Sequence, residues 1–419
     1  MRSDSSATPS HPGADVHEVL RGIRVIEVAQ YVFVPVASGV LAEWGAEVIK
    51  VEPPGAGDAY RGLRSTGNLA VAGPVNYAIQ HANRGKRSIG IDLASEAGHA
   101  LLGELLGTAD VLLTNLLPGS RRRLGLELET VRAFNPSIIY GRGTGLGERG
   151  PERDRGGFDH AAFWARSGAQ FGATPPEADR PSPMPSGAYG DSMGGLALAG
   201  AIGAALFKRE RTGEPSVVDL SLLGLGMWSM ASAISAAMMQ GEAARPMERI
   251  PAANPLAGTY RTRDGRWIVL GALQGFTQWP ALCRCLGRPE WIEDTRFDER
   301  ERFDANLDAC ALLLEELFEA EPLAHWSEAL AGFDGVWEVV QDTLEAARDP
   351  QAAANGLIAE LDGPAGEKFE LVATPIQFDE HAAIPHPAPE TGQHTEEILL
   401  ELGMDWDRIT ELRRAGTIG

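Results

Sequence analysis

The sequence predicts an α/β protein, with a large Rossmann-like domain built on a parallel β-sheet and a smaller α+β domain. Three observations support this prediction. From residue 20 to residue 140, short apolar segments of strand character alternate with segments of helical periodicity, which is the pattern of repeated β-α-β units. Beyond Gly241 this alternation gives way to a hairpin signal and amphipathic helices. A chain of 419 residues is also long enough for two or three structural units.

Each element of the large domain follows from the spacing of its apolar residues. The expected strands are Ile23–Ala29, Glu47–Glu52, Arg87–Leu93, Asp110–Leu116, Ser137–Tyr140 and Ser216–Leu220. The expected helices are Val36–Trp44, Ser95–Leu106, Pro118–Asn135 (mostly helical), Leu196–Phe207 and Ser221–Met239. Because strands that alternate with helices run parallel, we expect one sheet covered on both faces.

The region beyond Gly241 is expected to form the smaller domain. Asp264-Gly265 is a two-residue hairpin signal between the expected strands Gly258–Arg263 and Arg266–Leu273. The other expected elements are helices Asn306–Ala320 and Pro322–Leu330, strand Gly335–Val340, and two amphipathic segments near the C-terminus, Thr395–Leu402 and Trp406–Ala415.

Composition excludes several classes of partner. The net charge of −21 argues against a nucleic-acid partner, which would require a basic surface. Three clustered cysteines, Cys283, Cys285 and Cys310, do not make a disulfide framework or a usual zinc site. No signal peptide is evident, so a cytoplasmic location is expected. The uncharged run Leu222–Met239 is about long enough to cross a bilayer, but it lacks flanking basic residues, and we interpret it as a buried helix rather than a membrane span.

The sequence also argues against the usual cofactors of α/β folds. The segment Gln30–Pro35 after the first strand contains no glycine, and no Gly-x-Gly-x-x-Gly opens a helix. We therefore expect no NAD site, no Walker-type phosphate loop and no metal site.

The most informative stretch for chemistry is Ser186–Gly195, which places Asp191 among glycines and serines before an apolar segment. Its structural interpretation is that Asp191 or Ser192 caps the following helix. Its functional interpretation is that glycines allow close approach of a ligand, while the helix N-terminus stabilises negative charge there.

The same stretch matches Gly-x-Ser-x-Gly at Gly190–Gly194, the pattern of a nucleophilic serine. In that hypothesis Ser192 would attack, with His381, His386 or His394 as the base. A nucleophile of this kind should follow a buried strand, and the proline-rich segment Pro181–Tyr189 is not strand-like, which disfavours a serine hydrolase.

Taken together, the motifs resemble the class III CoA-transferases, the family of formyl-CoA transferase that also includes α-methylacyl-CoA racemase. The resemblance extends from about Leu20 to the C-terminus. The motifs that carry it are Leu20–Glu27, Gly45–Glu52, Gly55-x-Gly57-Asp58, Lys86–Ile89, Asp110–Asn115, Pro118-Gly119, Arg123-Leu-Gly125, Gly190-Asp191-Ser192 and Pro389-x-x-Gly392-Gln-His-Thr395.

The resemblance implies an acyl-CoA:carboxylate CoA-transferase in which Asp191 is the nucleophile. Its carboxylate would attack the donor thioester to give a mixed anhydride, and the CoA thiolate would return to give an aspartyl-CoA thioester. An acceptor carboxylate would then take the CoA through a second anhydride. Coenzyme A enters as the acyl-CoA substrate, and no metal or NAD is implied.

The resemblance also implies where CoA binds. Arg123 matches an arginine that meets the nucleotide phosphates. The other matching positions are Val32, Phe33, Ile91, Asp92, Leu93, Ala94, Asn115, Leu116, Leu117, Gly157, Phe158 and Asp159. Members of the family are homodimers with interlocked chains, so an interlocked dimer is expected.

In this family both ends of the chain build the large domain, with the smaller domain between them. We therefore expect a flexible tail (residues 1–19), the first part of the large domain (20–220), a helical linker (221–250), the small domain (251–345), a return linker (346–373) and the C-terminal part of the large domain (374–419).

Two departures from the family pattern bear on function. The racemase carries Gly-His-Asp where this chain has Gly157-Phe158-Asp159, and phenylalanine cannot exchange a proton, which disfavours the alternative of a racemase-like enzyme. An arginine that contacts CoA in relatives is Pro53 here. Tyr31 and Phe33, beside the expected site, favour a bulky or apolar acyl group over a small oxalate-like one.

Overall fold

The computed structural model describes residues 18–66, 69–71, 73–246, 248–250, 253–363 and 366–419. The chain divides into two compact units. Unit 1 comprises Met1–Gln170, Pro183–Glu242 and Pro350–Gly419, and unit 2 comprises Phe171–Ser182 and Ala243–Asp349. Nearly all of the expected N-terminal tail, residues 1–17, lies outside the described residues.

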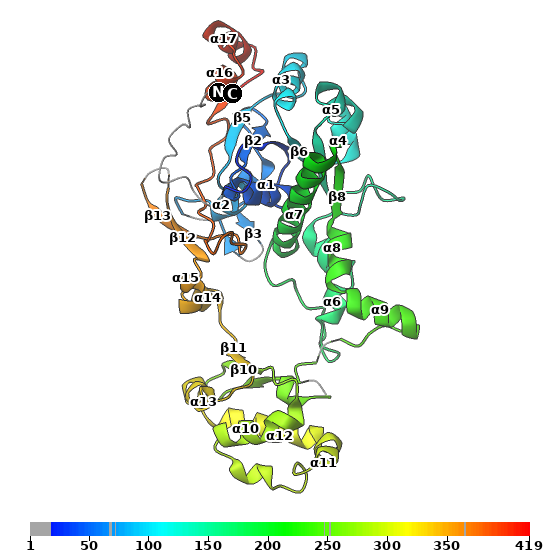
Figure 1. Ribbon diagram of the computed structural model, residues 1–419, viewed down its shortest axis with the longest axis vertical. Helices are drawn as coiled ribbons and strands as arrows, with labels where there is room; N and C mark the ends of the chain where they lie inside the picture. The colour runs from blue at the N-terminus through cyan, green and yellow to red at the C-terminus, as the bar shows by residue number, and fades with distance from the viewer. Residues whose placement is uncertain (1–17, 67–68, 72, 247, 251–252, 364–365) are drawn as a thin grey trace, which may run out of the picture. The chain divides into compact units, whose positions relative to one another are not determined.

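Unit 1 is built on a six-stranded parallel sheet with the order β5-β2-β1-β6-β7-β8 (Figure 1). Its strands are β1 (Arg24–Val28), β2 (Glu47–Glu52), β5 (Arg87–Gly90), β6 (Val111–Thr114), β7 (Ile139–Thr144) and β8 (Val217–Ser221). In the register of the sheet, Ile26 lies opposite both Ile49 and Leu112. The predicted parallel α/β sheet is confirmed. The chain builds outward from β1 in both directions, so a topological switch point lies between β1 and β6.

Helices cover both faces of the sheet, so its strands are buried on both sides. One face packs against α1 (Phe33–Glu43), α2 (Tyr77–Asn83) and α7 (Tyr189–Thr212). The other packs against α3 (Glu96–Gly107), α5 (Leu128–Phe134), α16 (Thr395–Glu401) and α17 (Trp406–Arg414). The C-terminal segment therefore completes the core of unit 1.

Three helical predictions needed correction. Helix α7 begins at Tyr189, seven residues before the expected start at Leu196. Pro118–Asn135 is two helices, α4 (Pro118–Arg123) and α5, because Gly125 between them adopts a left-handed φ of 66°. Ser221–Met239 is also two helices, α8 (Leu222–Ser229) and α9 (Ala231–Gln240), bent by 74°. Glycine and serine weaken the helical preference of that segment.

The remaining elements of unit 1 are short. They are η1 (Ala59–Gly62), β3 (Ser65–Thr66), β4 (Leu69–Ala70), a π-helical turn at His160–Ala165, α15 (Pro350–Ala354) and the antiparallel pair β12 (Ile358–Asp362) and β13 (Lys368–Val372). Helix α6 (Ala169–Gly172) lies where the chain leaves unit 1. Unit 1 also takes in α8, α9 and the β12–β13 hairpin, which fall in the segments expected as linkers.

Unit 2 is a small α+β unit. Its antiparallel sheet has the order β11-β10-β9, and the predicted hairpin at Asp264-Gly265 joins β9 to β10. The elements are β9 (Thr259–Arg261), β10 (Trp267–Leu270), α10 (Gly275–Cys285), α11 (Arg300–Ala305), α12 (Leu307–Ala320), α13 (Leu323–Leu330), β11 (Trp337–Val339) and α14 (Thr343–Ala347), with short 3₁₀ turns at Pro255–Ala257 and Pro289–Ile292. Its core is rich in aromatic residues, including Trp279, Phe303 and Trp326.

By length and apolar composition, α7 is long enough to cross a membrane, and α8 with α9 would pass only as a bent pair. This is weak evidence for a span, because a core helix of a soluble protein meets the same test. Helix α7 packs closely on α1, where a Cβ at Gly195 would lie 2.5 Å from Val36 Cγ1.

Candidate active site

Two adjoining cavities lie at the carboxyl ends of the strands, where open α/β sheets bind ligands. The first, about 340 Å³, is formed after β1, β2, β5 and β6. The second, about 300 Å³, contains Asp191. Gln30, Leu116 and Ser120 line both cavities. The two cavities therefore share part of their wall at the switch point of the sheet.

Most of the CoA contacts predicted from the resemblance line these cavities. In the first cavity these are Ile91, Asp92, Leu93, Ala94, Leu116 and Arg123, together with Pro53. In the second they are Phe33, Asn115, Leu116, Leu117, Gly157 and Phe158. Two predicted residues lie elsewhere: Val32 belongs to the hydrophobic core, and the Asp159 carboxyl is buried beside the start of α7.

Asp191 is the third residue of α7, and its side chain is buried. The interpretation of Asp191 or Ser192 as the helix cap is therefore wrong. The capping position is Ala188, whose φ of 62° is left-handed and costs energy for a residue with a Cβ. Gly190 lets this turn pack on Phe163, since a Cβ there would lie 2.6 Å from the ring. The backbone is thus shaped to place a carboxyl inside the helix and against a cavity.

Two carboxyl groups interact at this turn. Burial, together with the charge of Asp159, raises the pKa of Asp191 to about 7. Burial also raises the pKa of Asp159, although the N–H groups of His160, Asp191 and Gly190 favour its ionised form. The Asp159 Oδ1 accepts a hydrogen bond from the His160 N–H at 2.7 Å. The pair therefore holds Asp191 as a poorly solvated carboxyl that is only partly ionised near neutral pH.

This electrostatic arrangement predicts the pH dependence of any reaction that needs Asp191 as a carboxylate. The value of kcat/KM should rise tenfold per pH unit below about pH 7 and level off above it. In Asp159→Asn the neighbouring negative charge is removed, so the pKa of Asp191 falls and the acid limb moves to lower pH. A kcat/KM profile of both proteins measures this shift. An unchanged limb in Asp159→Asn would show that Asp159 does not tune Asp191.

The neighbouring Ser192 is held by a histidine from another element. His81 Nε2, on α2, lies 2.9 Å from Ser192 Oγ, and Ser192 Oγ donates to the Ala188 carbonyl at 2.8 Å. Because the hydroxyl has one proton, this arrangement makes His81 the donor to Ser192. Burial and the charge of Arg84 lower the pKa of His81 to about 4, so it is neutral at pH 7 and a weak base.

These contacts correct the hypothesis of a serine nucleophile. Within the described residues, the histidine on Ser192 is His81 and not His381, His386 or His394. His381 Nδ1 contacts the Asp379 carbonyl, and His394 Nδ1 accepts the N–H of Ser88. Ser192 Oγ is hydrogen-bonded to the first turn of α7. Its partner His81, with a pKa of about 4, is too weak a base to activate it as a nucleophile.

The loop after β1 forms the wall of the second cavity opposite α7. Tyr31 has a left-handed φ of 66°, and its N–H donates to Asp58 Oδ1 at 3.1 Å. Asn115 fixes the preceding residue, since it accepts the Gln30 N–H at 3.0 Å and donates to the Gln30 carbonyl. The predicted ligand contact Asn115 therefore also shapes the loop.

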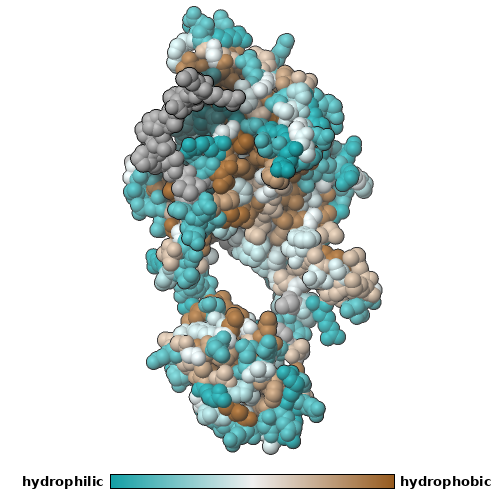
Figure 2. Space-filling model, viewed as in Figure 1, coloured by the Kyte–Doolittle hydropathy of each residue, from teal (hydrophilic) through white to brown (hydrophobic). Residues whose placement is uncertain are grey.

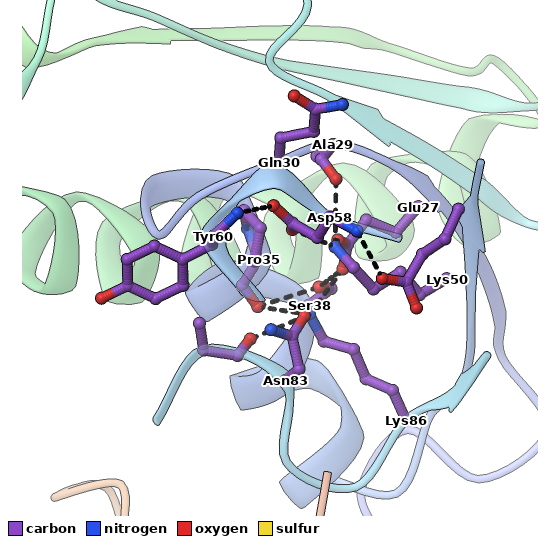
Figure 3. A network of polar contacts seen from close by, with 12 residues as sticks. Glu27, Ala29, Gln30, Pro35, Ser38, Lys50, Asp58, Tyr60, Asn83 and Lys86 are labelled. Atoms are coloured by element: carbon purple, nitrogen blue, oxygen red, sulfur yellow. Dashed lines mark hydrogen bonds and ion pairs between the residues drawn. The ribbon is translucent and has the colours of Figure 1, made fainter. Parts of the chain in front are cut away.

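Beneath this loop lies a buried network of charges (Figure 3). Lys50 Nζ lies 2.6 Å from Glu27 Oε1 and 2.9 Å from Asp58 Oδ2, and Lys86 Nζ lies 2.6 Å from Glu27 Oε2. Burial opposes ionisation of Glu27, but the two lysines outweigh it and lower its pKa. Burial also opposes the charge of Lys50, but Glu27 and Asp58 raise its pKa. Glu27 and Lys50 are therefore charged, whereas burial lowers the pKa of Lys86 to about 7.

In the part of the chain that the structure describes, no group of three or more His, Cys, Asp or Glu side chains is arranged to hold a metal ion.

Comparison with known proteins places this geometry in a family. The model of the family described as CoA-transferase family III matches residues 20–395. The chain belongs to CoA-transferase family III, and the resemblance predicted from the sequence motifs is confirmed.

Relatives within family III cover almost the whole chain. The (R)-2-hydroxy-4-methylpentanoate CoA-transferase of Clostridioides difficile is 30% identical over 94% of this chain and 98% of that protein. The succinyl-CoA:glutarate CoA-transferase of Homo sapiens is 31% identical over 97% of this chain and 92% of that protein. A crystal structure of a CAIB/BAIF family protein from Brucella suis matches with a TM-score of 0.78 at 28% identity, over 92% of this chain and all of that chain. By family and relatives, this chain is a class III CoA-transferase.

Sequence reasoning missed His81, the support of Tyr31 by Asp58, and the pairing of Asp159 with Asp191. The only signal for Asp58 was its place in the Gly55-x-Gly57-Asp58 motif. His81 carries no local signal, because its contact with Ser192 joins residues 111 positions apart.

Proposed function

We propose that this family III chain transfers CoA from an acyl-CoA to a free carboxylate, with the Asp191 carboxylate as the covalent nucleophile. The observation that carries the proposal is a buried carboxyl with a pKa near 7 in a cavity that adjoins a second cavity at the strand ends. A carboxylate is a weak nucleophile in water, and burial removes the solvation that weakens it.

The first half of the reaction consumes the donor. An Asp191 oxygen attacks the thioester carbonyl, the C–S bond breaks, and CoA leaves as the thiolate. The thiolate then attacks the Asp191 carbonyl of the mixed anhydride. The donor leaves as a free carboxylate, and Asp191 carries the CoA as a thioester.

The second half repeats these steps with the acceptor. The acceptor carboxylate attacks the aspartyl thioester and releases CoA thiolate, which gives a second anhydride. The thiolate attacks the acceptor carbonyl, so the new acyl-CoA leaves and the Asp191 carboxylate is restored. No proton is gained or lost overall, consistent with a site whose first requirement is an ionised Asp191 rather than a general acid and base.

The two cavities suggest where each part of the acyl-CoA substrate would bind. The first cavity, with Arg123 at its edge, would hold the nucleotide part of CoA, since an arginine suits phosphate oxygens. Arg123 Nη2 lies 3.2 Å from Ser120 Oγ, a neutral partner that leaves the guanidinium charge available to a ligand. The thioester would then reach the second cavity and Asp191.

Trapping the covalent intermediate tests the proposal. The protein is incubated with a panel of acyl-CoAs, treated with hydroxylamine or borohydride, and analysed by intact-mass spectrometry and peptide mapping. We expect a modification on Asp191. A label on Ser192 would indicate a hydrolase, and solvent deuterium at the α-carbon of the acyl group without any adduct would indicate a racemase-like enzyme.

We also propose that the chain forms an interlocked homodimer, as the family resemblance implies, and that it is cytoplasmic. The support for a dimer is the exposed apolar surface of α8 and α9: Trp228 is 78% exposed, Met238 and Met239 are also exposed, and α9 has no buried residue. In Figure 2 the surface at the place of α9 is mostly tan to white. An exposed apolar face of this kind is typical of an interface. The oligomeric state in solution, measured by light scattering, tests it.

A further inference from the structure

Two aromatic side chains face the cavity that contains Asp191. The rings of Tyr31 and Phe158 meet edge to face, with centroids 5.4 Å apart and planes at 83°. Phe158 also stacks on His160, with centroids 6.4 Å apart. It remains 54% exposed despite these contacts, so it is not a core residue. An aromatic surface left open beside a candidate nucleophile is a binding surface for an apolar group.

The position of Tyr31 is imposed by the buried charge network rather than by its own preference. A left-handed tyrosine is strained, and such strain persists where the surroundings hold it. Asp58 holds Tyr31 in place, because its Oδ1 accepts the N–H of Tyr31 at 3.1 Å and that of Tyr60 at 2.9 Å. Figure 3 shows the contact between Asp58 and Tyr60. Lys50, 2.9 Å from Asp58 Oδ2, fixes the carboxylate in turn. The buried charges therefore have a role in the site, since they fix the residue that holds Tyr31.

The rest of the cavity wall is mixed. Phe33, Leu117 and Leu222 extend the apolar surface. Arg153 and Arg155 also line the cavity, but each lies beside an acidic side chain: Arg155 Nη1 is 2.7 Å from Glu152 Oε1, and Arg153 Nε is 3.5 Å from Asp154 Oδ2. Phe158, the most exposed part of the aromatic wall, presents only a hydrocarbon ring to the acyl group.

We infer that Tyr31 and Phe158 form the acyl-binding wall and select CoA thioesters of bulky apolar acids, with a ring or a branched chain. Asp58 is the positioning residue that holds Tyr31 in this wall. The inference rests on the proposed function, since it assumes that acyl groups are delivered to Asp191. An apolar wall favours such a group over a small one, which makes fewer contacts, and over a doubly charged one, whose second carboxylate would lose water against the rings.

Selectivity measurements test the inference. We would compare kcat/KM for phenylacetyl-CoA and isovaleryl-CoA with that for acetyl-CoA and succinyl-CoA in the full-length protein. The bulky apolar thioesters should be preferred. In Phe158→Ala the ratio of phenylacetyl-CoA to acetyl-CoA should fall by about 10-fold to 100-fold, the range for lost apolar contacts in a pocket. Phe158→Leu should retain part of the ratio.

A matched control and a positioning variant sharpen the result. Phe207→Ala removes a phenylalanine that is 67% exposed on α7 but lines neither cavity, and it should leave the ratio unchanged. Asp58→Asn should lower the ratio in the same direction as Phe158→Ala, while Tyr31→Phe, which keeps the ring, should retain it.

Three outcomes would overturn the inference. They are an unchanged ratio in Phe158→Ala, a preference for acetyl-CoA, and a preference for succinyl-CoA that is lost in Arg153→Ala. Mapping of the adduct in the same samples separates these from failure of the proposed function. If Asp191 is labelled by some thioester, the function stands and only the acyl class is at issue; if none labels Asp191, the function itself fails.

Discussion

Asp191→Asn is expected to lose CoA transfer by on the order of 10⁴-fold or more, the scale for removal of a covalent nucleophile. The amide has nearly the same shape as the carboxyl, so the cavity and the first turn of α7 are kept. What is lost is the anionic oxygen that forms the anhydride and the thioester. Steady-state transfer assays and the absence of a covalent adduct would measure the loss.

The same substitution should not destabilise the protein. The pKa of Asp191 is raised to about 7, so the folded state prefers its neutral form, and stability falls as pH rises from the unfolded pKa toward 7. Each pKa unit corresponds to about 1.4 kcal/mol. Asp191→Asn is neutral at every pH and should therefore be at least as stable as the parent at pH 8.

A surface substitution is the control for this experiment. Glu104→Gln on α3 removes an exposed carboxylate outside the first turn of the helix and should leave both transfer and stability unchanged. Transfer within tenfold of the parent in Asp191→Asn would contradict the mechanism. Loss of transfer together with unfolding would contradict the electrostatic account of this site.

Lys50→Met is expected to have the largest effect on folding. Lys50 is fully buried and lies between Glu27 and Asp58, so methionine would leave their negative charge compensated only by Lys86. Breaking a buried ion pair by removal of one partner costs about 3–5 kcal/mol. Chemical denaturation at pH 7 measures the loss. It should be smaller near pH 5, because burial lowers the pKa of Lys86 to about 7 and a charged Lys86 compensates Glu27 more fully below that pH.

Arg408→Met is the matched control for Lys50→Met. Its ion pair with Glu411 on α17 is exposed on both sides, and such pairs contribute about 1 kcal/mol at most. A loss in Lys50→Met no greater than in Arg408→Met would show that the charge network does not support unit 1.

Local sequence patterns predicted much of the fold because the strands of a parallel sheet are continuous apolar runs. The strands at residues 24–28 and 47–52 fall within one residue of their expected bounds at each end. Helix starts were predicted less well, and α7 shows why. Tyr189, Gly190 and the left-handed Ala188 give no capping signal, and the early start depends on packing against Phe163 and α1.

The sequence by itself determined the parallel sheet and the separate α+β unit, because these depend on periodicity. The candidate nucleophile, Asp191, came from the family resemblance of the contiguous motif around it. The tertiary structure alone decided what surrounds that nucleophile. Asp159 raises its pKa, His81 holds its neighbour, and Asp58 holds Tyr31 across the cavity. These relations join residues between 27 and 111 positions apart, and electrostatic and hydrogen-bonding distances between such residues exist only once the sheet and its helices have packed.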